Sequence, residues 1–243
     1  DRSVIICFAY GVAGATSIDS LLLTMATVST GGFMGQGNPL EDGAVRWVAV
    51  VGMVVSGTSI VVLWRLVVGR GRGLLRSREL RTYLLILATA TALFLAWSGS
   101  SGDMNLREAL FTVSSALTTT GFPSEPIGEW PAALPVLLLL LVAIGPMTGS
   151  AGGGFQVLRL RILINIARRE LVRQLHPRVV ARVRLGERVA DESTLRQVIV
   201  VQFVFVAVLF VTALLIAALG LDLVAALSAS VHAVSTAGPV RVL

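Results

Sequence analysis

Four apolar stretches of this chain approach or exceed the length that crosses a lipid bilayer. They cover residues 44–68, 82–97, 131–158 and 198–220, and a span requires about 20 apolar residues. Hydrophobic residues make up 55% of the 243 residues and charged residues only 14%, too little charge to cover a soluble domain of this size. The apolar runs are continuous rather than alternating, which favours membrane helices. The sequence therefore predicts an all-α integral membrane protein.

The basic residues are concentrated in two segments, and this determines the predicted orientation. All 20 are arginine, with six in residues 65–81 and ten in residues 159–196. Short loops rich in arginine stay on the cytoplasmic side of a membrane. We therefore expect loops 65–81 and 159–197 to be cytoplasmic in a multi-pass protein of the plasma (inner) membrane, in contact with membrane lipid. This asymmetry accounts for the formal charge of +6, and nucleic acid is not an expected partner.

One short module occurs three times along the chain. Each copy has about a dozen apolar and small residues, then Ser or Thr, Thr, a small residue and Gly. The copies are residues 20–33 (SLLLTMATVSTGGF), 109–122 (ALFTVSSALTTTGF) and 226–239 (ALSASVHAVSTAGP), aligned on Gly32, Gly121 and Gly238. The aligned glycines are unevenly spaced, which indicates a module repeated with insertions and not a solenoid.

Each copy of the module is predicted to be a short helix that does not cross the membrane. About a dozen helical residues rise roughly 18 Å, well short of the hydrocarbon core of about 30 Å. The chain must then leave by the side from which it entered, so the turn after the helix lies at membrane depth. Irregular backbone is tolerated there only against protein or in a wet cavity. The expected helix starts are Ser17 or Asp19, Asn105 and Asp222.

The turn after each short helix has the chemistry of a cation filter. It follows a helix C-terminus, where the helix dipole presents partial negative charge. Glycine allows a positive φ, so that successive carbonyl oxygens can face the same way, and the three turns contain no carboxylate. A ring of neutral carbonyls suits a monovalent cation, as in potassium filters. In an alternative interpretation the small residues only permit close helix packing, but three aligned copies favour the filter.

Several motifs resemble those of the Trk/Ktr/HKT superfamily of potassium transporters, in particular its bacterial Trk-type membrane subunit. TVSTGGF, TTTGFP and STAGP resemble the second, third and fourth pore loops of that family. VVSGTSIVVLWRLVVGR, followed by RSRELR, resembles the exit helix and charged turn of the second repeat, and AIGPMTGSAGGGFQVLRL the broken helix of the third. The resemblance implies modules of membrane helix, pore helix, filter loop and membrane helix in a pseudo-fourfold arrangement. It also implies potassium uptake.

The resemblance further implies which residues bind the ion. Potassium would contact backbone carbonyls of Thr30, Gly31, Gly32, Thr119, Thr120, Gly121, Thr236, Ala237 and Gly238. In the fourth loop the family often has asparagines where this chain has Ser235 and Thr236. No cofactor is implied besides the transported ion. The sequence contains no Ser/His/Asp set and no cluster of metal ligands, so we do not expect an enzyme.

The resemblance also divides the chain into parts. These are residues 1–81 (second pore repeat, opening helix truncated), 82–165 (third repeat), 166–197 (cytoplasmic linker) and 198–243 (fourth repeat, truncated after its filter). The first repeat and the last helix of the family are not matched, so the chain would supply at most three of four filter walls. Two interpretations stay open: part of an ion-conducting subunit, or a non-conducting remnant or assembly partner of such a transporter.

A glycine-rich segment interrupts the third apolar stretch. Residues 145–154 read GPMTGSAGGG, and Pro146 lacks a backbone donor, so the helix must break. The segment lacks the Gly-Lys-Ser/Thr of a phosphate-binding loop, which leaves a plain helix kink or a plug beneath the filter. The resemblance favours a gate, with residues Gly149, Ser150, Gly152, Gly153, Gly154 and Gln156, the last in place of the usual lysine.

The arginine-rich linker is the expected contact for other proteins. Its portion RVVARVRLGERVADEST, with a central glycine, predicts a short β-hairpin. The resemblance implies a cytosolic nucleotide-binding gating subunit as a partner, and a homodimer.

Overall fold

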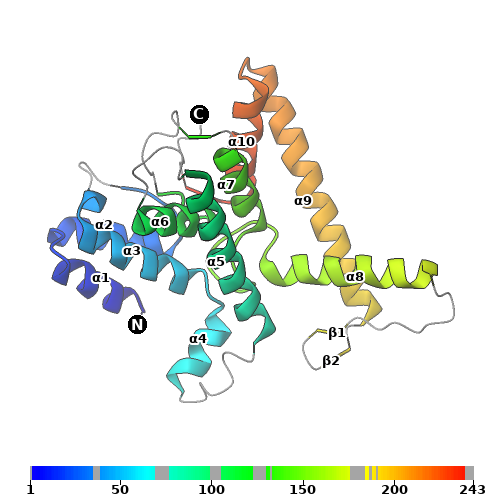
Figure 1. The fold of residues 1–243 in the computed structure, drawn as a ribbon, viewed down its shortest axis with the longest axis horizontal. Coiled ribbons are helices and arrows are strands. Elements are labelled where there is room, and N and C mark those ends of the chain that lie inside the picture. The colour runs from blue at the N-terminus through cyan, green and yellow to red at the C-terminus, as the bar shows by residue number, and fades with distance from the viewer. Residues whose placement is uncertain are drawn as a thin grey trace.

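The computed structural model describes residues 2–34, 39–68, 77–98, 105–122, 130–131, 133–175, 184–185, 188–189 and 191–238. The first helices are α1 (Arg2–Val12), α2 (Ser17–Val28), α3 (Gly43–Ser56) and α4 (Ile60–Val67), with a 3-10 turn at Pro39–Glu41 before α3. The next are α5 (Arg78–Ser98), α6 (Leu106–Leu117), α7 (Ala133–Ile144) and α8 (Val157–Leu175). The last elements are strands β1 (Arg184–Leu185) and β2 (Arg188–Val189), then α9 (Glu192–Ala218) and α10 (Leu223–Val234). The predicted all-α class is confirmed (Figure 1).

Three short helices repeat along the fold as the sequence predicts. Helices α2, α6 and α10 have 12 residues each. Helices α6 and α10 begin after the expected caps Asn105 and Asp222. Helix α2 differs, because its N-cap is Thr16, whose hydroxyl oxygen accepts a hydrogen bond from the backbone N–H of Asp19. Neither Ser17 nor Asp19 is therefore the cap, although both lie in the first turn.

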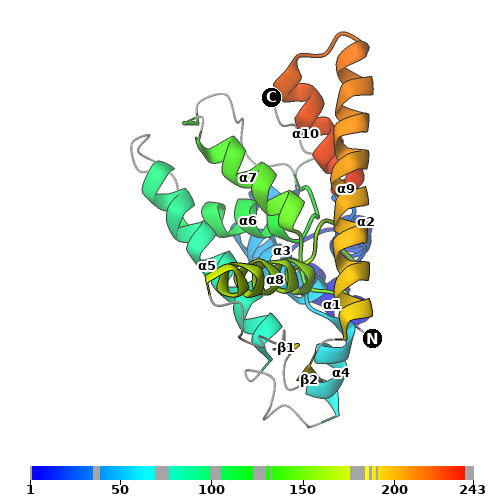
Figure 2. The same cartoon turned by 90° about the vertical axis from the view of Figure 1, so that its right-hand side faces the viewer.

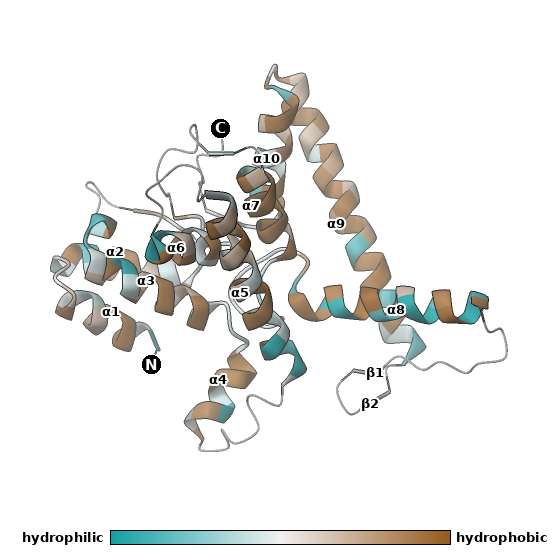
Figure 3. Cartoon of the chain, in the orientation of Figure 1, coloured by the Kyte–Doolittle hydropathy of each residue, from teal (hydrophilic) through white to brown (hydrophobic). Residues whose placement is uncertain are grey.

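Two helices are long and apolar enough to cross a membrane by themselves. They are α5, with 21 residues, and α9, with 27 residues. Helix α9 runs along one side of the molecule, and α10 folds back against it (Figure 2). Figure 3 shows α9 as mostly hydrophobic, and large side chains such as Phe203, Phe210 and Leu214 are exposed along it. An apolar helix so exposed requires lipid or another apolar surface around it.

The predicted span at residues 44–68 is wrong as a single helix. The chain breaks at Gly57–Ser59, and α3 and α4 meet there at an angle of 104°. The break is stabilised by distant backbone, since the carbonyl of Gly57 accepts from Met147 N–H (3.1 Å) and the N–H of Ile60 donates to the Gly149 carbonyl (3.1 Å). These partners are distant in the sequence, so the local apolar pattern of residues 44–68 suggests one helix.

The third apolar stretch is interrupted as predicted. Helix α7 ends at Ile144, and α8 begins at Val157 after the glycine-rich segment. Helix α8 continues to Leu175, so the expected start of the cytoplasmic linker at residue 166 falls inside a helix. It lies across α9 and alternates hydrophilic with hydrophobic residues (Figures 1 and 3). The predicted hairpin is present as the antiparallel pair of β1 and β2.

The core is organised around α6, the most deeply buried of the short helices. On one side Phe111 belongs to a cluster with Tyr10 of α1, Leu23 of α2 and Met53 of α3. On the other side Leu117 and Val113 belong to a second cluster that joins α5, α7 and α10. This second cluster also contains the buried side chains of Tyr83, Phe94, Leu134, Met147 and Val231. Packing on both faces places the C-terminus of α6 between the other two short helices.

Candidate functional site

The three short helices end in the same local geometry. In each, the residue after the C-cap has a left-handed φ, and the next residue donates its N–H to the carbonyl five residues earlier. This pair of features is a Schellman motif. The bonds join Gly31 to Ala26 (2.9 Å), Thr120 to Ser115 (3.0 Å) and Ala237 to His232 (2.9 Å). We call residues 29–32, 118–121 and 235–238 the first, second and third turn.

A threonine occupies the left-handed position of every turn. The φ angles are 54° at Thr30, 57° at Thr119 and 52° at Thr236. A β-branched residue is rarely found there, because its side chain crowds the backbone, and such a conformation costs about 1–3 kcal/mol. Glycine is the usual residue at this position. Strain at three equivalent positions is typical of a functional site and not of ordinary helix ends.

The three turns meet at one place in the fold. A β-carbon added to Gly121 would lie 2.7 Å from the N, Cα and O atoms of Gly238. One added to Gly32 would meet the carbonyl oxygens of Thr120 and Gly121. One added to Gly238 would meet the same Thr120 oxygen and, at 2.6 Å, the oxygen of Gly31. Glycine at these positions lets the backbones approach so closely, and carbonyl oxygens lie at the junction.

The side chains of the second turn are turned away from solvent and toward their own backbone. Thr118, Thr119 and Thr120 are each 0% exposed. The hydroxyls of Thr118 and Thr120 hydrogen-bond to each other at 2.8 Å, and that of Thr118 also donates to the Ser114 carbonyl at 2.7 Å. The hydroxyls of Thr118 and Thr120 are thus bonded to each other and to α6, while the carbonyl oxygens of Thr120 and Gly121 lie at the junction of the turns.

The glycine-rich segment lies directly against two of the turns. The N–H of Gly153 donates to the Thr119 hydroxyl oxygen at 3.1 Å. A β-carbon on Gly152 would lie 2.7 Å from the Thr118 carbonyl oxygen, and one on Gly153 would lie 2.6 Å from the Thr236 hydroxyl oxygen. Side chains at either position would push the segment away from the turns.

The remaining predicted gate residues shape the two ends of that segment. Gly149 and Gly154 have left-handed φ values of 75° and 81°, and Ser150 closes a tight turn through hydrogen bonds to the Met147 carbonyl. Gln156 also has a left-handed φ of 66°, and its side-chain oxygen is buried without a hydrogen-bond partner. Gln156 is thus a strained polar position in addition to Thr30, Thr119 and Thr236.

Sequence patterns miss three residues that hold the glycine-rich segment in place. Gly57 and Ile60 bind it through the backbone bonds at the α3–α4 break. Glu79, at the start of α5, accepts a hydrogen bond from the N–H of Thr148 at 2.8 Å. The small, polar run Gly57–Ser59 is a signal that could have indicated the break, whereas nothing in the sequence around Glu79 indicates its contact.

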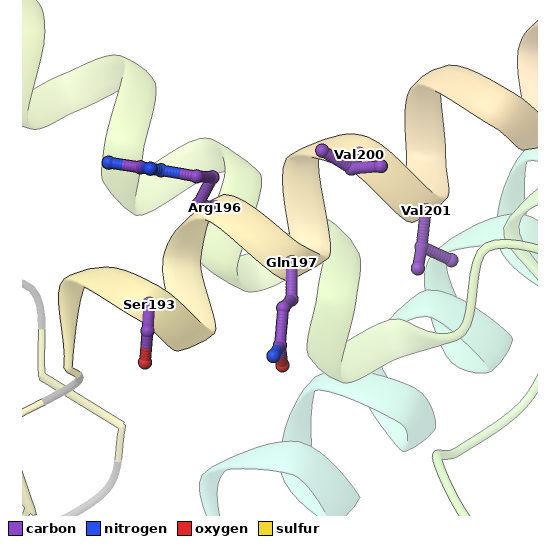
Figure 4. A pocket seen from close by; sticks show the side chains of 5 residues that line it. All are labelled: Ser193, Arg196, Gln197, Val200 and Val201. Atoms are coloured by element: carbon purple, nitrogen blue, oxygen red, sulfur yellow. The ribbon is translucent and has the colours of Figure 1, made fainter.

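A surface depression on α9 is separate from this site. Its lining side chains are Ser193, Arg196, Gln197, Val200 and Val201 (Figure 4). All five come from one helix, and Figure 4 shows them extending in different directions instead of converging on one point. Within the described ranges, no group of three His, Cys, Asp or Glu side chains is arranged to hold a metal ion. The backbone oxygens at the junction of the turns are therefore the main candidate for ion contact.

These features define an all-helical membrane protein of repeated units, in which short helices that do not cross the bilayer bring their C-terminal turns together. The sequence profile of the family described as TrkH: Cation transport protein matches residues 100–240. This chain belongs to that family, as the motifs predict. The family is one of ion transporters, which also confirms that the chain is not an enzyme.

Individual relatives agree with this assignment. The chain is 30% identical to the Trk system potassium uptake protein TrkH of Escherichia coli (strain K12), over 93% of this chain and 49% of that protein. It is 27% identical to TrkI of Halomonas elongata, over 98% of this chain and 50% of that protein. The crystal structure of the potassium transporter TrkH from Vibrio parahaemolyticus matches with a TM-score of 0.91 and 26% identity, over 98% of this chain and 53% of that one. The chain spans about half the length of the curated relatives it matches.

Proposed function

We propose that this chain forms three walls of the ion pathway of a potassium uptake transporter. The observation that supports this most is the meeting of the three strained turns, in which glycines bring carbonyl oxygens of neighbouring repeats to one junction. The relatives it matches are named as potassium uptake proteins. Residues 30–32, 119–121 and 236–238 are the filter in this proposal. The fourth wall would come from the part of the transporter that lies outside the region matched by this chain.

The chemistry of the junction suits a monovalent cation. Its oxygens are neutral carbonyls, and the turns carry no carboxylate. The C-terminal ends of α2, α6 and α10 add partial negative charge from three helix dipoles. A potassium ion that loses its water to such carbonyls is stabilised without the strong binding that a charged ring would produce, and can leave again.

The glycine-rich segment is the proposed gate. It contacts the second and third turns through Gly152 and Gly153, which is where an ion would leave the filter toward the cytoplasm. Its five glycines lower the cost of rearranging the backbone, because glycine adopts several conformations. Movement of this segment would open the path without any change in the turns themselves.

The proposed orientation places the arginine-rich segments in the cytoplasm of an inner-membrane protein. Arginines on α8 and in the linker near β1 and β2 supply the positive-inside signal. The basic linker is also the proposed contact for a cytosolic nucleotide-binding gating subunit. The exposed apolar surface of α9 is compatible with lipid and with a homodimer.

Flux through the complete transporter polypeptide in liposomes tests this function. The purified protein should take up rubidium or potassium down a concentration gradient, with preference over sodium. Deletion of residues 149–153 should raise the flux, because the segment beneath the turns is removed while the turns remain. The absence of flux from a well-folded protein would refute the transport function, and unchanged or lower flux from the deletion variant would refute the gate.

A further inference from the structure

Three consecutive residues of the glycine-rich segment are held by backbone or carboxylate partners outside it. Met147 N–H donates to the Gly57 carbonyl (3.1 Å), and the Gly149 carbonyl accepts from Ile60 N–H (3.1 Å). Between them, the N–H of Thr148 donates to a carboxylate oxygen of Glu79 at 2.8 Å. The helix break deprives these groups of helical partners, so the external bonds replace the helical ones. Glu79 is the single charged side chain among the three partners.

The three partners come from two places in the chain. Gly57 and Ile60 lie at the break before α4, and Glu79 lies in the first turn of α5. Partners from both places bind the same three residues, Met147, Thr148 and Gly149.

The surroundings of Glu79 make its bond a stable but releasable one. The residue is half-buried, and a hydrogen bond to an ionised carboxylate is about twice as strong as a neutral one. The guanidinium of Arg161, on α8, acts on the same carboxylate through its charge. Arg161 follows the glycine-rich segment in the chain, in the second turn of α8. Tyr83, one turn further along α5, is fully buried against the α3–α4 break.

We propose that Glu79 is a positioning residue that latches the glycine-rich segment against the second and third turns. The inference rests on the proposed function only for its effect on flux. Its structural part, the tethering of Thr148, is independent of what passes through the pathway.

Hydrogen exchange of residues 145–156 in the complete protein tests the latch directly. Glu79→Ala removes the acceptor of Thr148 N–H, and the loss of a bond to a charged group accelerates exchange of that amide by about tenfold or more. Glu79→Gln keeps an acceptor oxygen and should restore much of the protection. Glu170→Ala, at an exposed acid on α8 that pairs with Arg169 and Arg173, should leave exchange in 145–156 unchanged.

Flux measurements on the same variants complete the test. Glu79→Ala should raise the maximal flux several-fold without changing the potassium concentration for half-saturation, because the turns are untouched. In a protein lacking residues 149–153, Glu79→Ala should have no additional effect. If Glu79→Ala does not fold, Glu79→Asp shortens the side chain with its charge retained and should show the same direction of change.

The two proposals fail in distinguishable ways. If the wild-type protein and the deletion variant carry no potassium, the transport function is wrong, and hydrogen exchange still decides whether Glu79 tethers the segment. If flux and the deletion behave as proposed but Glu79→Ala has wild-type exchange and wild-type flux, the latch is wrong. An equal effect of Glu79→Ala in the presence and absence of residues 149–153 would also overturn it.

Discussion

Replacement of Gly121 by alanine tests whether close approach of the turns is needed for transport. Gly121 has a φ of 75°, and a β-carbon there would lie 2.7 Å from three backbone atoms of Gly238. Backbone atoms cannot move aside as the end of a flexible side chain can. The second and third turns must therefore separate, or one of them must change its conformation.

The cost can be worked from two contributions. A left-handed φ costs an L-residue with a β-carbon about 1–2 kcal/mol. Inserting a carbon into a closely packed place costs a further 1–3 kcal/mol, roughly, when the neighbours must shift. The sum is about 2–5 kcal/mol, and every 1.4 kcal/mol is a factor of ten. If this cost destabilises the arrangement of the turns that coordinates the ion, flux falls by at least about 30-fold.

Rubidium flux into liposomes containing the Gly121→Ala protein measures this loss. The matched control is Gly11→Ala in α1, where an added β-carbon would approach nothing closer than the Ser20 hydroxyl oxygen at 4.0 Å. That variant should retain wild-type flux, and its melting temperature should not fall, since alanine favours a helix over glycine by about 1 kcal/mol. Wild-type flux and ion preference in Gly121→Ala would refute the argument that the turns must meet this closely.

Two further predictions concern single hydroxyl groups. Thr119→Ala removes the acceptor of Gly153 N–H and should raise flux several-fold. Thr30→Ala, at the equivalent strained position, where the hydroxyl donates to the Ser29 carbonyl of its own turn, should not raise flux. Equal effects of the two substitutions in a flux assay would contradict the contact between Thr119 and Gly153. Tyr10→Phe removes the buried 2.8 Å hydrogen bond between Tyr10 and Thr27 and should lower the free energy of unfolding by about 1 kcal/mol. The melting temperature should fall while the ion preference stays unchanged. An unchanged melting temperature would show that this bond does not contribute to stability.

Much of the fold follows from signals that are local in the sequence. The short helices are set by caps such as Asn105 and Asp222 and by the Thr-and-Gly runs that end them. The break after Ile144 follows from Pro146 and five glycines, which no helix tolerates. Repetition of one local pattern in three places is also what predicts that the turns have a common role.

Other features depend on contacts that no local pattern contains. The α3–α4 break is stabilised by backbone groups of Met147 and Gly149, about ninety residues away, so residues 44–68 suggest one helix. Glu79 reads as an ordinary acid near a helix start, and only the fold brings it to Thr148. Helix α8 extends to Leu175, although its arginines suggest a cytoplasmic loop.

The location of a heavy alkali-like ion in an experimental structure tests the central claim most directly. Crystals of the complete protein grown with rubidium or thallium should show an anomalous peak at the junction of the three turns, within coordination distance of carbonyl oxygens from residues 30–32, 119–121 and 236–238. No peak at that junction, with the turns filled by side chains or lying apart from one another, would contradict the account.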